Sequence, residues 1–360
     1  MSCRRFYRVT VSRSTTWRKT TVTSTERTHN TFAGKPVNRL PNQPILMTFA
    51  GRWAGIPYGE YVRDHRKMIE AQLRMVEDFE VDLVQVISDP AREAADCGAI
   101  VKWYDDQPPA IDEENALLKD KATLARLKQP DPLDGGRMHD RVLGCALGRK
   151  RVGNAVPVCG WVEGPMAQAA DLRGINRIML DLIDDPKFVV DLFEFLTELE
   201  ICFARAQVDA GADIIGIGDA AASLINDELY REYVLPFEKR EVQAIREMGV
   251  YTRLHICGNV THHLEAMGEL GVNMVDIDFL TDLSQVRSGM GSEVTVLGNV
   301  DPVEVVQNGT PETIFAALEE CHRTVGDDRF IIGAGCEITP GTVPENLRAL
   351  AEYARHPMNH

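Results

Sequence analysis

Eight short apolar runs, separated by longer amphipathic stretches, constrain the fold of this chain more than any other feature. The runs span residues 45–50, 82–87, 156–161, 212–217, 250–255, 273–278, 294–297 and 330–333. Each has the length and composition of a buried strand. Strands that alternate with helices form parallel sheets with crossover connections, so eight such units predict an α/β fold, a single (β/α)8 TIM barrel.

The stretches between these runs show helical spacing. It is clearest from Val189 to Ala206, where apolar residues recur on one face. Gly211 and Gly249 follow two of the predicted helices and can end them before the next strand. The connection from about 88 to 155 is too long for one crossover, and we expect it to form an insertion over the C-terminal mouth of the barrel.

The first 25 residues differ from the rest of the chain. They are rich in Ser, Thr and Arg and contain no acidic residue. We therefore expect residues 1–25 to be a disordered basic extension and residues 26–360 to be the barrel domain. A transit peptide, upstream sequence from a wrongly chosen start codon, or an expression artefact would have the same composition.

Charge and cysteine usage exclude some classes of function. A net charge of -15 argues against a nucleic-acid partner, which would need a concentrated basic face. No apolar run approaches the roughly 20 residues of a transmembrane helix, so we expect no membrane partner. The eight cysteines are scattered without close pairs, which favours reduced thiols or metal ligands over disulfides. We expect a soluble, cytoplasmic enzyme.

A His-x-Cys motif at the end of the fifth predicted strand is the strongest chemical signal. Side chains two apart on a strand point the same way, so His255 and Cys257 can direct an imidazole and a thiolate to one point. Cys336 follows the last predicted strand, and active sites of such barrels lie at the carboxyl ends of strands. A Cys2His set leaves one position of tetrahedral zinc open, as in catalytic sites. His-x-Cys alone is equally typical of a buried thiol beside a hydrogen-bonded histidine.

Two further motifs have competing interpretations. Gly216 to Ala221 fits the G-x-G-x-x-A dinucleotide fingerprint, with Glu238 about 20 residues on. Because this stretch lies in the middle of the barrel pattern, we interpret it as coincidence. His262 and His263 could extend a metal site, or they could lie in the solvated first turn of a helix.

From about Glu26 to its end, the chain resembles the uroporphyrinogen decarboxylase superfamily. The matching segments are Gly34–Arg39, Ala50–Trp53, Glu163–Pro165, Tyr233–Phe237 and Gly298–Pro302. The resemblance implies a (β/α)8 barrel, in agreement with the strand count. The superfamily contains true decarboxylases and zinc-dependent methyltransferases that work with corrinoid proteins.

Two positions separate these branches. The decarboxylases bind a tetrapyrrole carboxylate through arginines near the first strand and an aspartate after the second, and Arg52 and Asp89 match one arginine and that aspartate. They carry a further arginine where this chain has Thr48, and a histidine where it has Cys336. The methyltransferase branch instead shows His-x-Cys followed far downstream by Cys, as this chain does.

The resemblance therefore implies Zn2+ held by His255, Cys257 and Cys336. The methyl group would move between methylcobalamin, on a partner corrinoid protein or as free cofactor, and a thiol, folate or small methylated substrate. The alternative is a metal-free uroporphyrinogen decarboxylase-type lyase, and a third possibility is a corrinoid- or tetrapyrrole-binding carrier without turnover. We predict six further site residues: Asp219, Glu163 and Asp89 as catalytic, with Glu163 as fourth ligand or proton carrier, and Arg52, Asn259 and Asn299 as substrate-binding.

Overall fold

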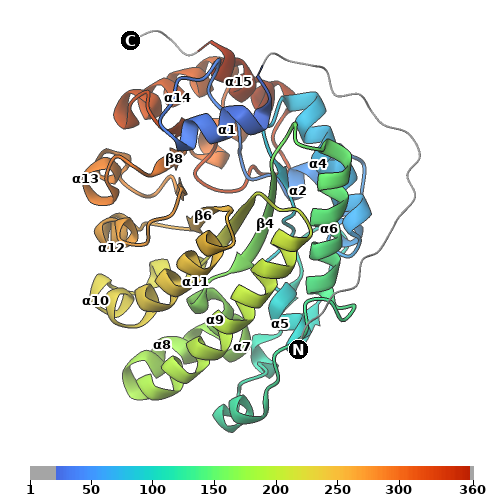
Figure 1. The fold of residues 1–360 in the computed structure, drawn as a ribbon, viewed down its shortest axis with the longest axis vertical. Coiled ribbons are helices and arrows are strands. Elements are labelled where there is room, and N and C mark those ends of the chain that lie inside the picture. Colours follow the sequence, from blue (N-terminus) through green and yellow to red (C-terminus); the bar gives the residue numbers. More distant parts are fainter. Residues whose placement is uncertain (1–21, 357–360) are drawn as a thin grey trace.

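The computed structural model describes residues 22–356, and its centre is a curled parallel sheet of seven strands (Figure 1). Neighbouring strands pair in parallel, in the order β1-β4-β5-β6-β7-β8-β9. The strands are β1 (Val84–Gln85), β4 (Val158–Glu163), β5 (Ile214–Gly218), β6 (Tyr251–Ile256), β7 (Met274–Ile277), β8 (Thr295–Leu297) and β9 (Phe330–Ile331). The α/β prediction and seven of the eight predicted strands are confirmed.

The first predicted strand, 45–50, is wrong: residues 45–47 belong to no strand, and the rest is helical. Helix α2 begins at Thr48 and buries Phe49 and Ala50. A short apolar run fits a buried helix as well as a buried strand, so periodicity alone could not separate the two.

An extended segment before α2 joins the two edges of the sheet. The N–H of Gln43 donates to the carbonyl of Ile332 beyond β9, and the N–H of Asp82 before β1 donates to the carbonyl of Asn42. Segment 41–43 therefore takes the place of an eighth strand, and the sheet closes into a ring. We call the end of this ring that holds the carboxyl ends of the strands the mouth.

Helices cover the outside of the ring. Helix α9 shows why they form: Asp185 caps its first turn, Pro186 opens it, and Gly211 with φ +111° follows its end. Its apolar face, which includes Leu192 and Phe203, is fully buried. Each such side chain contributes roughly 1.5–3 kcal/mol on leaving water. The predicted helix and its stop are confirmed.

Figure 1 shows α9 and α11 side by side on one part of the ring, with α14 and α15 at another. The helices are α1 (Ser24–Phe32), α2 (Thr48–Trp53), α3 (Tyr58–Tyr61), α4 (His65–Phe79), α5 (Arg92–Asp96), α6 (Arg137–Val152), α7 (Pro165–Arg173), α8 (Ile175–Asp184), α9 (Pro186–Asp209), α10 (Asp227–Leu229), α11 (Leu235–Glu247), α12 (Leu264–Gly268), α13 (Val286–Met290), α14 (Pro311–Val325) and α15 (Pro344–Arg355).

The long connection between β1 and β4 holds more than a crossover helix. Helix α6 packs on α4 and β4 as a regular outer helix. The preceding residues form α5 and an antiparallel pair, β2 (Val101–Lys102) and β3 (Ala110–Ile111). The predicted extension 1–25 lies outside the described residues as far as residue 21, and α1 begins two residues before the predicted boundary at Glu26. No described helix is long and apolar enough to cross a membrane.

Candidate metal centre

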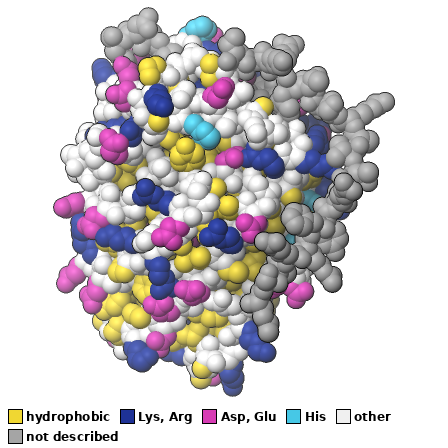
Figure 2. All heavy atoms as spheres, viewed as in Figure 1, with side chains coloured by type: hydrophobic (Ala, Val, Ile, Leu, Met, Phe, Trp, Pro, Cys, Tyr) yellow, Lys and Arg dark blue, Asp and Glu magenta, His cyan; other side chains and the backbone are white. Residues whose placement is uncertain are grey.

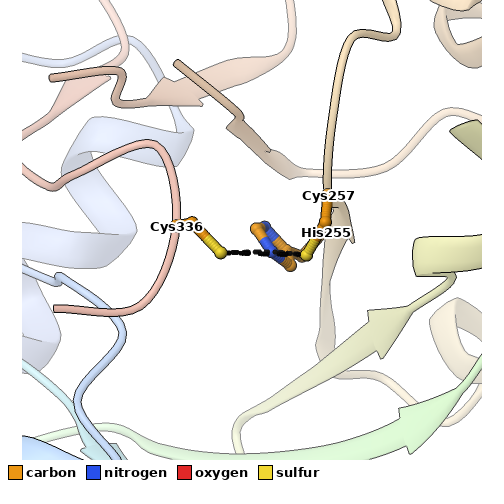
Figure 3. A group of neighbouring side chains, drawn as sticks. All are labelled: His255, Cys257 and Cys336. Carbon is orange, nitrogen blue, oxygen red and sulfur yellow. Dashed lines mark hydrogen bonds between the residues drawn. The ribbon is translucent and has the colours of Figure 1, made fainter. Parts of the chain in front are cut away.

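Three predicted ligands, which come from two distant parts of the chain, meet at the mouth (Figure 3). His255 lies on β6, Cys257 follows it, and Cys336 reaches towards them from the segment after β9. The Nε2 atom of His255 is 3.0 Å from Cys257 Sγ and 3.8 Å from Cys336 Sγ. The two sulfur atoms are 3.8 Å apart. His255 is buried, whereas both cysteines are partly open.

These separations are compatible with one tetrahedral ion. Zinc–sulfur bonds of about 2.3 Å and zinc–nitrogen bonds of about 2.0 Å require roughly 3.8 Å between sulfurs and 3.6 Å between sulfur and nitrogen. The sulfur–sulfur distance meets this value, and the two sulfur–nitrogen distances lie on either side of theirs. Among the described residues, His255, Cys257 and Cys336 form the one group of three or more His, Cys, Asp or Glu residues whose ligand atoms all lie within 4.8 Å of one another.

The three side chains differ in how readily each loses a proton, as their pKa shifts show. Hydrogen bonding from Cys257, reinforced by His255 and opposed by burial, lowers the pKa of the Cys336 thiol to about 4. The same contact with Cys336, together with burial, raises the pKa of Cys257. Burial lowers the pKa of His255, but Cys336 and Asp276 outweigh it, so the net shift is upward. The thiolate form is therefore favoured at Cys336 and disfavoured at Cys257. A bound cation would take the place of the protons on Cys257 and His255 that stabilise this thiolate.

A buried carboxylate stands behind the histidine. Asp276 Oδ2 lies 3.7 Å from His255 Nδ1, which has no hydrogen-bond partner although it is buried. Arg253 holds that carboxylate through its Nε and a guanidinium nitrogen at 2.8 Å. Metal-bound histidines usually donate their second ring N–H to such a carboxylate, which fixes the ring. The orphaned Nδ1 is therefore consistent with Nε2 as the ligand atom.

The segment that carries Cys336 is fixed from both sides. The backbone N–H and the hydroxyl of Thr48 both donate to Glu337 Oε1, each at 2.7 Å. The N–H of Gly335 donates to the carbonyl of Val300, and a Cβ on Gly335 would lie 2.2 Å from the backbone nitrogen of Phe279. Thr48, which stands where the resemblance places a decarboxylase arginine, thus holds the residue next to Cys336, the third predicted ligand. Sequence reasoning missed this contact, because it joins residues 289 positions apart.

Glu163 faces the ligands from two strands away. The register sets Glu163 beside Gly218, and Gly218 beside His255. Because Gly218 has no side chain, nothing on β5 separates them, and a Cβ there would lie 3.2 Å from Glu163 Oε2. The carboxylate lies outside the group of three ligands. Burial, and then the charge of Glu93, raises the pKa of Glu163 well above its usual value.

Asp219 follows β5 and turns towards helix α7. Its carboxylate accepts hydrogen bonds from the N–H groups of Ala167 at 2.6 Å and Met166 at 3.2 Å. Its own N–H donates to the carbonyl of His255. Burial raises the pKa of Asp219 to about 7, against the effect of the two backbone donors. Asp219 therefore links β6, which carries His255, to the start of α7.

Two other predicted site residues, Asp89 and Arg52, do not belong to the group of three predicted ligands. Asp89 is buried, and both of its oxygens accept from Arg137, at 2.8 and 2.7 Å. Burial raises its pKa, but Arg137 outweighs this, so the pKa of Asp89 is lowered. Arg52 lies exposed on α2. Arg137, which no sequence signal singled out, therefore neutralises the predicted aspartate.

Both predicted asparagines make hydrogen bonds within the mouth loops. The side-chain oxygen of Asn259 accepts from the N–H of Thr261, and Asn299 Nδ2 donates to the carbonyls of Asp278 and Thr281. These contacts shape the loops, and substrate binding by either residue stays a prediction.

The two motifs with competing interpretations also have clear positions. Gly216 lies inside β5 against the ring of Trp161, so the tight turn of a dinucleotide fingerprint is absent there. His263 is buried and not solvated as expected: its ring stacks on Tyr230 and reaches Asp227 at 3.4 Å.

Helices α5, α9 and α11 carry a group of carboxyls that the sequence analysis did not identify. Glu93, Glu200, Glu238 and Glu241 are all fully buried, and seven of their eight oxygens have no hydrogen-bond partner. The eighth, on Glu238, accepts from the hydroxyl of Tyr230. Burial raises the pKa of all four, most strongly for the last three. We call these four residues the buried carboxyl cluster, and burial favours the protonated form of each.

Comparisons with known proteins confirm the resemblance read from the sequence. A methylcobamide:CoM methyltransferase MtbA from Methanosarcina mazei is 32% identical over 346 residues, 94% of this chain and 99% of that protein. A uroporphyrinogen decarboxylase from Synechocystis sp. is 26% identical over 298 residues, 80% of this chain and 82% of that protein. The solved structure of a methyltransferase from Methanosarcina mazei has a TM-score of 0.84 at 24% identity, over 93% of this chain and 98% of that one. The model of the uroporphyrinogen decarboxylase (URO-D) family matches residues 23–357, and the chain belongs to that family.

Proposed function

We propose that this protein is a zinc-dependent methyltransferase that moves a methyl group from a methylcobamide to a thiol. One observation carries the proposal: Cys336 lies 3.8 Å from both Cys257 Sγ and His255 Nε2. Relatives named methylcobamide:CoM methyltransferase and methylated-thiol–coenzyme M methyltransferase support the reaction class. Folate and small methylated substrates remain candidate partners of the same chemistry.

Zinc held by His255, Cys257 and Cys336 would keep one coordination position for the acceptor thiol and favour its thiolate at neutral pH. In the overall reaction the acceptor sulfur supplies the electron pair of the new carbon–sulfur bond. The pair of the broken cobalt–carbon bond stays on cobalt, and the thiol proton is released.

The chain's own residues orient the site and carry that proton. Arg253 fixes Asp276, and Asp276 stands behind the ring of His255. Glu163 faces the ligands across Gly218, and Asp219 has a pKa of about 7. A carboxyl that faces the reacting groups can accept and release a proton. We assign proton transfer to Glu163, and we assign to Asp219 the support of the strand of His255, because its carboxylate accepts from the N–H groups of Met166 and Ala167.

The insertion between β1 and β4 would border the mouth and limit access to it. Trp103, which follows β2, packs against the guanidinium groups of Arg63 at 4.2 Å and Arg137 at 4.9 Å. Arg137 in turn pairs with Asp89, four residues after β1. A corrinoid protein would approach from the open part of the mouth. Because the ligands must be reduced thiols, we propose a cytoplasmic location.

The absorbance of methylcobalamin tests the proposal. The zinc-loaded protein is mixed with methylcobalamin and a panel of thiols, and tetrahydrofolate is the non-thiol control acceptor. We expect thiol-dependent loss of the methyl–cobalt spectrum and formation of a thioether. Conversion of uroporphyrinogen to coproporphyrinogen by metal-free protein would instead support the lyase, although Asp89 is already occupied by Arg137. Binding of corrinoid without any turnover would indicate a carrier.

A further inference from the structure

Exposed apolar side chains are distributed unevenly between the two ends of the ring. The described residues include twelve large ones that are exposed: Ile100, Trp103, Tyr104, Leu133, Leu143, Leu180, Ile183, Leu224, Phe279, Leu280, Val303 and Val343. None lies in the short loops that lead into the strands at the opposite end of the ring. Five lie in segments that follow strands β5, β7, β8 and β9 at the mouth. Single exposed apolar side chains are ordinary, but a group at one end marks a contact surface.

Four of these residues, Leu224, Phe279, Leu280 and Val303, belong to loops that contact one another or the segments that carry the ligands. A Cβ on Gly258, next to Cys257, would lie 3.0 Å from Ser223 Oγ, one residue before Leu224. The hydroxyl of Thr281 donates to the carbonyl of Gly258 and so joins the loop of Phe279 and Leu280 to the same rim.

The rim continues on the other side of the ligands. Gly335 packs against the backbone of Phe279, and its N–H donates to the carbonyl of Val300, three residues before Val303. We call Leu224, Phe279, Leu280 and Val303 the apolar rim. It borders the metal centre from β5 round to β8.

The charges of this half of the mouth have one sign. The segments 219–228, 257–263, 278–285, 298–304 and 332–343 contain no Lys or Arg and eight Asp or Glu residues. Of these, Glu228, Asp282 and Glu304 are exposed. Elsewhere the surface is mixed, as Figure 2 shows for one face, where acidic and basic side chains alternate. The apolar rim is therefore edged by hydrogen-bond acceptors and lacks cationic donors.

We infer that the apolar rim is the seat of the corrin ring of the methylcobamide, an inference that rests on the proposed methyl transfer. A corrin is a broad, flat, apolar macrocycle whose periphery carries amide groups. Its face would cover the rim, and its amide N–H donors would meet the carboxylates at the edge. Seated there, the cobalt-bound methyl group faces the open side of His255, Cys257 and Cys336. Neither an anionic ligand nor an acidic protein surface fits an edge without cations.

Binding of free methylcobalamin tests the inference. The double variant Leu224→Ser/Leu280→Ser removes two exposed side chains of the rim, and Leu180→Ser/Ile183→Ser removes two comparably exposed ones from α8 as a matched control. The dissociation constant is measured by equilibrium dialysis on zinc-loaded protein, with zinc content determined for each variant. We expect the rim variant to bind methylcobalamin at least about tenfold more weakly, since two leucines lose their apolar cover, and the control to bind like the parent. The KM for the thiol should not change.

Equal binding by the rim variant and the parent would overturn the inference, and so would absence of binding to the parent. Failure of the corrin-binding rim can be distinguished from failure of the proposed methyl transfer. Rim-dependent binding without methylation of any thiol would leave the corrin seat standing and refute the methyl transfer. Equal rates of thiol methylation by parent and rim variant at subsaturating methylcobalamin would refute the corrin-binding rim and leave the methyl transfer standing.

Discussion

Replacing Glu200 by glutamine should make the protein more stable at pH 7 and leave it nearly unchanged at pH 5. Glu200 is fully buried on α9, and both of its oxygens lack hydrogen-bond partners. Burial, and then the charges of Glu93 and Glu241, raises its pKa well above the usual value. The folded protein therefore keeps a proton that the unfolded chain releases above about pH 4.5.

The sign and size of the effect follow from proton linkage. When the folded state binds one more proton than the unfolded state, the free energy of unfolding falls by about 1.4 kcal/mol for each pH unit. That stability is present in full below the unfolded pKa and is lost as the pH rises towards the raised folded pKa. Between pH 5 and pH 7 one such carboxyl costs about 2.7 kcal/mol. Glutamine has no proton to lose, although its buried amide offsets about 1 kcal/mol of the gain.

Urea unfolding, followed by circular dichroism at pH 5, 6 and 7, measures the difference. We expect Glu200→Gln to exceed the parent by roughly 2 kcal/mol at pH 7 and to show a shallower loss of stability with pH. Glu198→Gln is the matched control, because Glu198 lies exposed two residues earlier on the same helix. A difference between Glu200→Gln and the parent that does not change with pH would refute the assignment of a neutral buried carboxyl.

Three further substitutions test the surroundings of the metal centre and of the ring. Asp276→Asn should weaken zinc binding by about 10–100-fold in competition with a chelator, because it alters the carboxylate behind His255; unchanged affinity would remove Asp276 from the site. Thr48→Val deletes the hydroxyl that donates to Glu337 and should lower zinc affinity by roughly fivefold, about 1 kcal/mol, in the same competition; an equal loss in overall stability without a loss of zinc would show that the contact does not position Cys336. Gly216→Ala places a Cβ 2.6 Å from the Trp161 ring and should lower the free energy of unfolding by about 1–3 kcal/mol in urea titrations; a fully stable variant would show that the ring can move aside.

The sequence predicted the ligands more completely than it predicted their surroundings. His255 and Cys257 are brought together by strand periodicity, which is local, and Cys336 follows from the rule that strand ends share one edge of the fold. The seven strands from β1 to β9 were found for the same reason. The segment at 45–50 was not, because a six-residue run that is apolar except for Thr48 fits a strand or a buried helix equally.

Contacts between distant residues were beyond sequence reasoning. Asp89 was predicted to be catalytic, and nothing in the sequence indicated that both of its oxygens would accept hydrogen bonds from Arg137. Thr48 and Glu337 meet only because α2 and the Cys336 segment lie side by side at the mouth. Glu200 did carry a signal, since it shares the helical face of Leu196 and Phe203, and a carboxyl on an apolar stripe marks a buried acid.

The zinc content of the Cys336→Ser variant decides whether His255, Cys257 and Cys336 form a metal centre. The parent and Cys202→Ser, a control at an exposed cysteine on α9, should each hold about one zinc per chain after dialysis. Cys336→Ser should lose the metal and, with it, the thiol-dependent loss of the methyl–cobalt spectrum. Zinc retained by Cys336→Ser at parental affinity, or thiol methylation by zinc-free protein at the parental rate, would contradict a metal centre built from His255, Cys257 and Cys336.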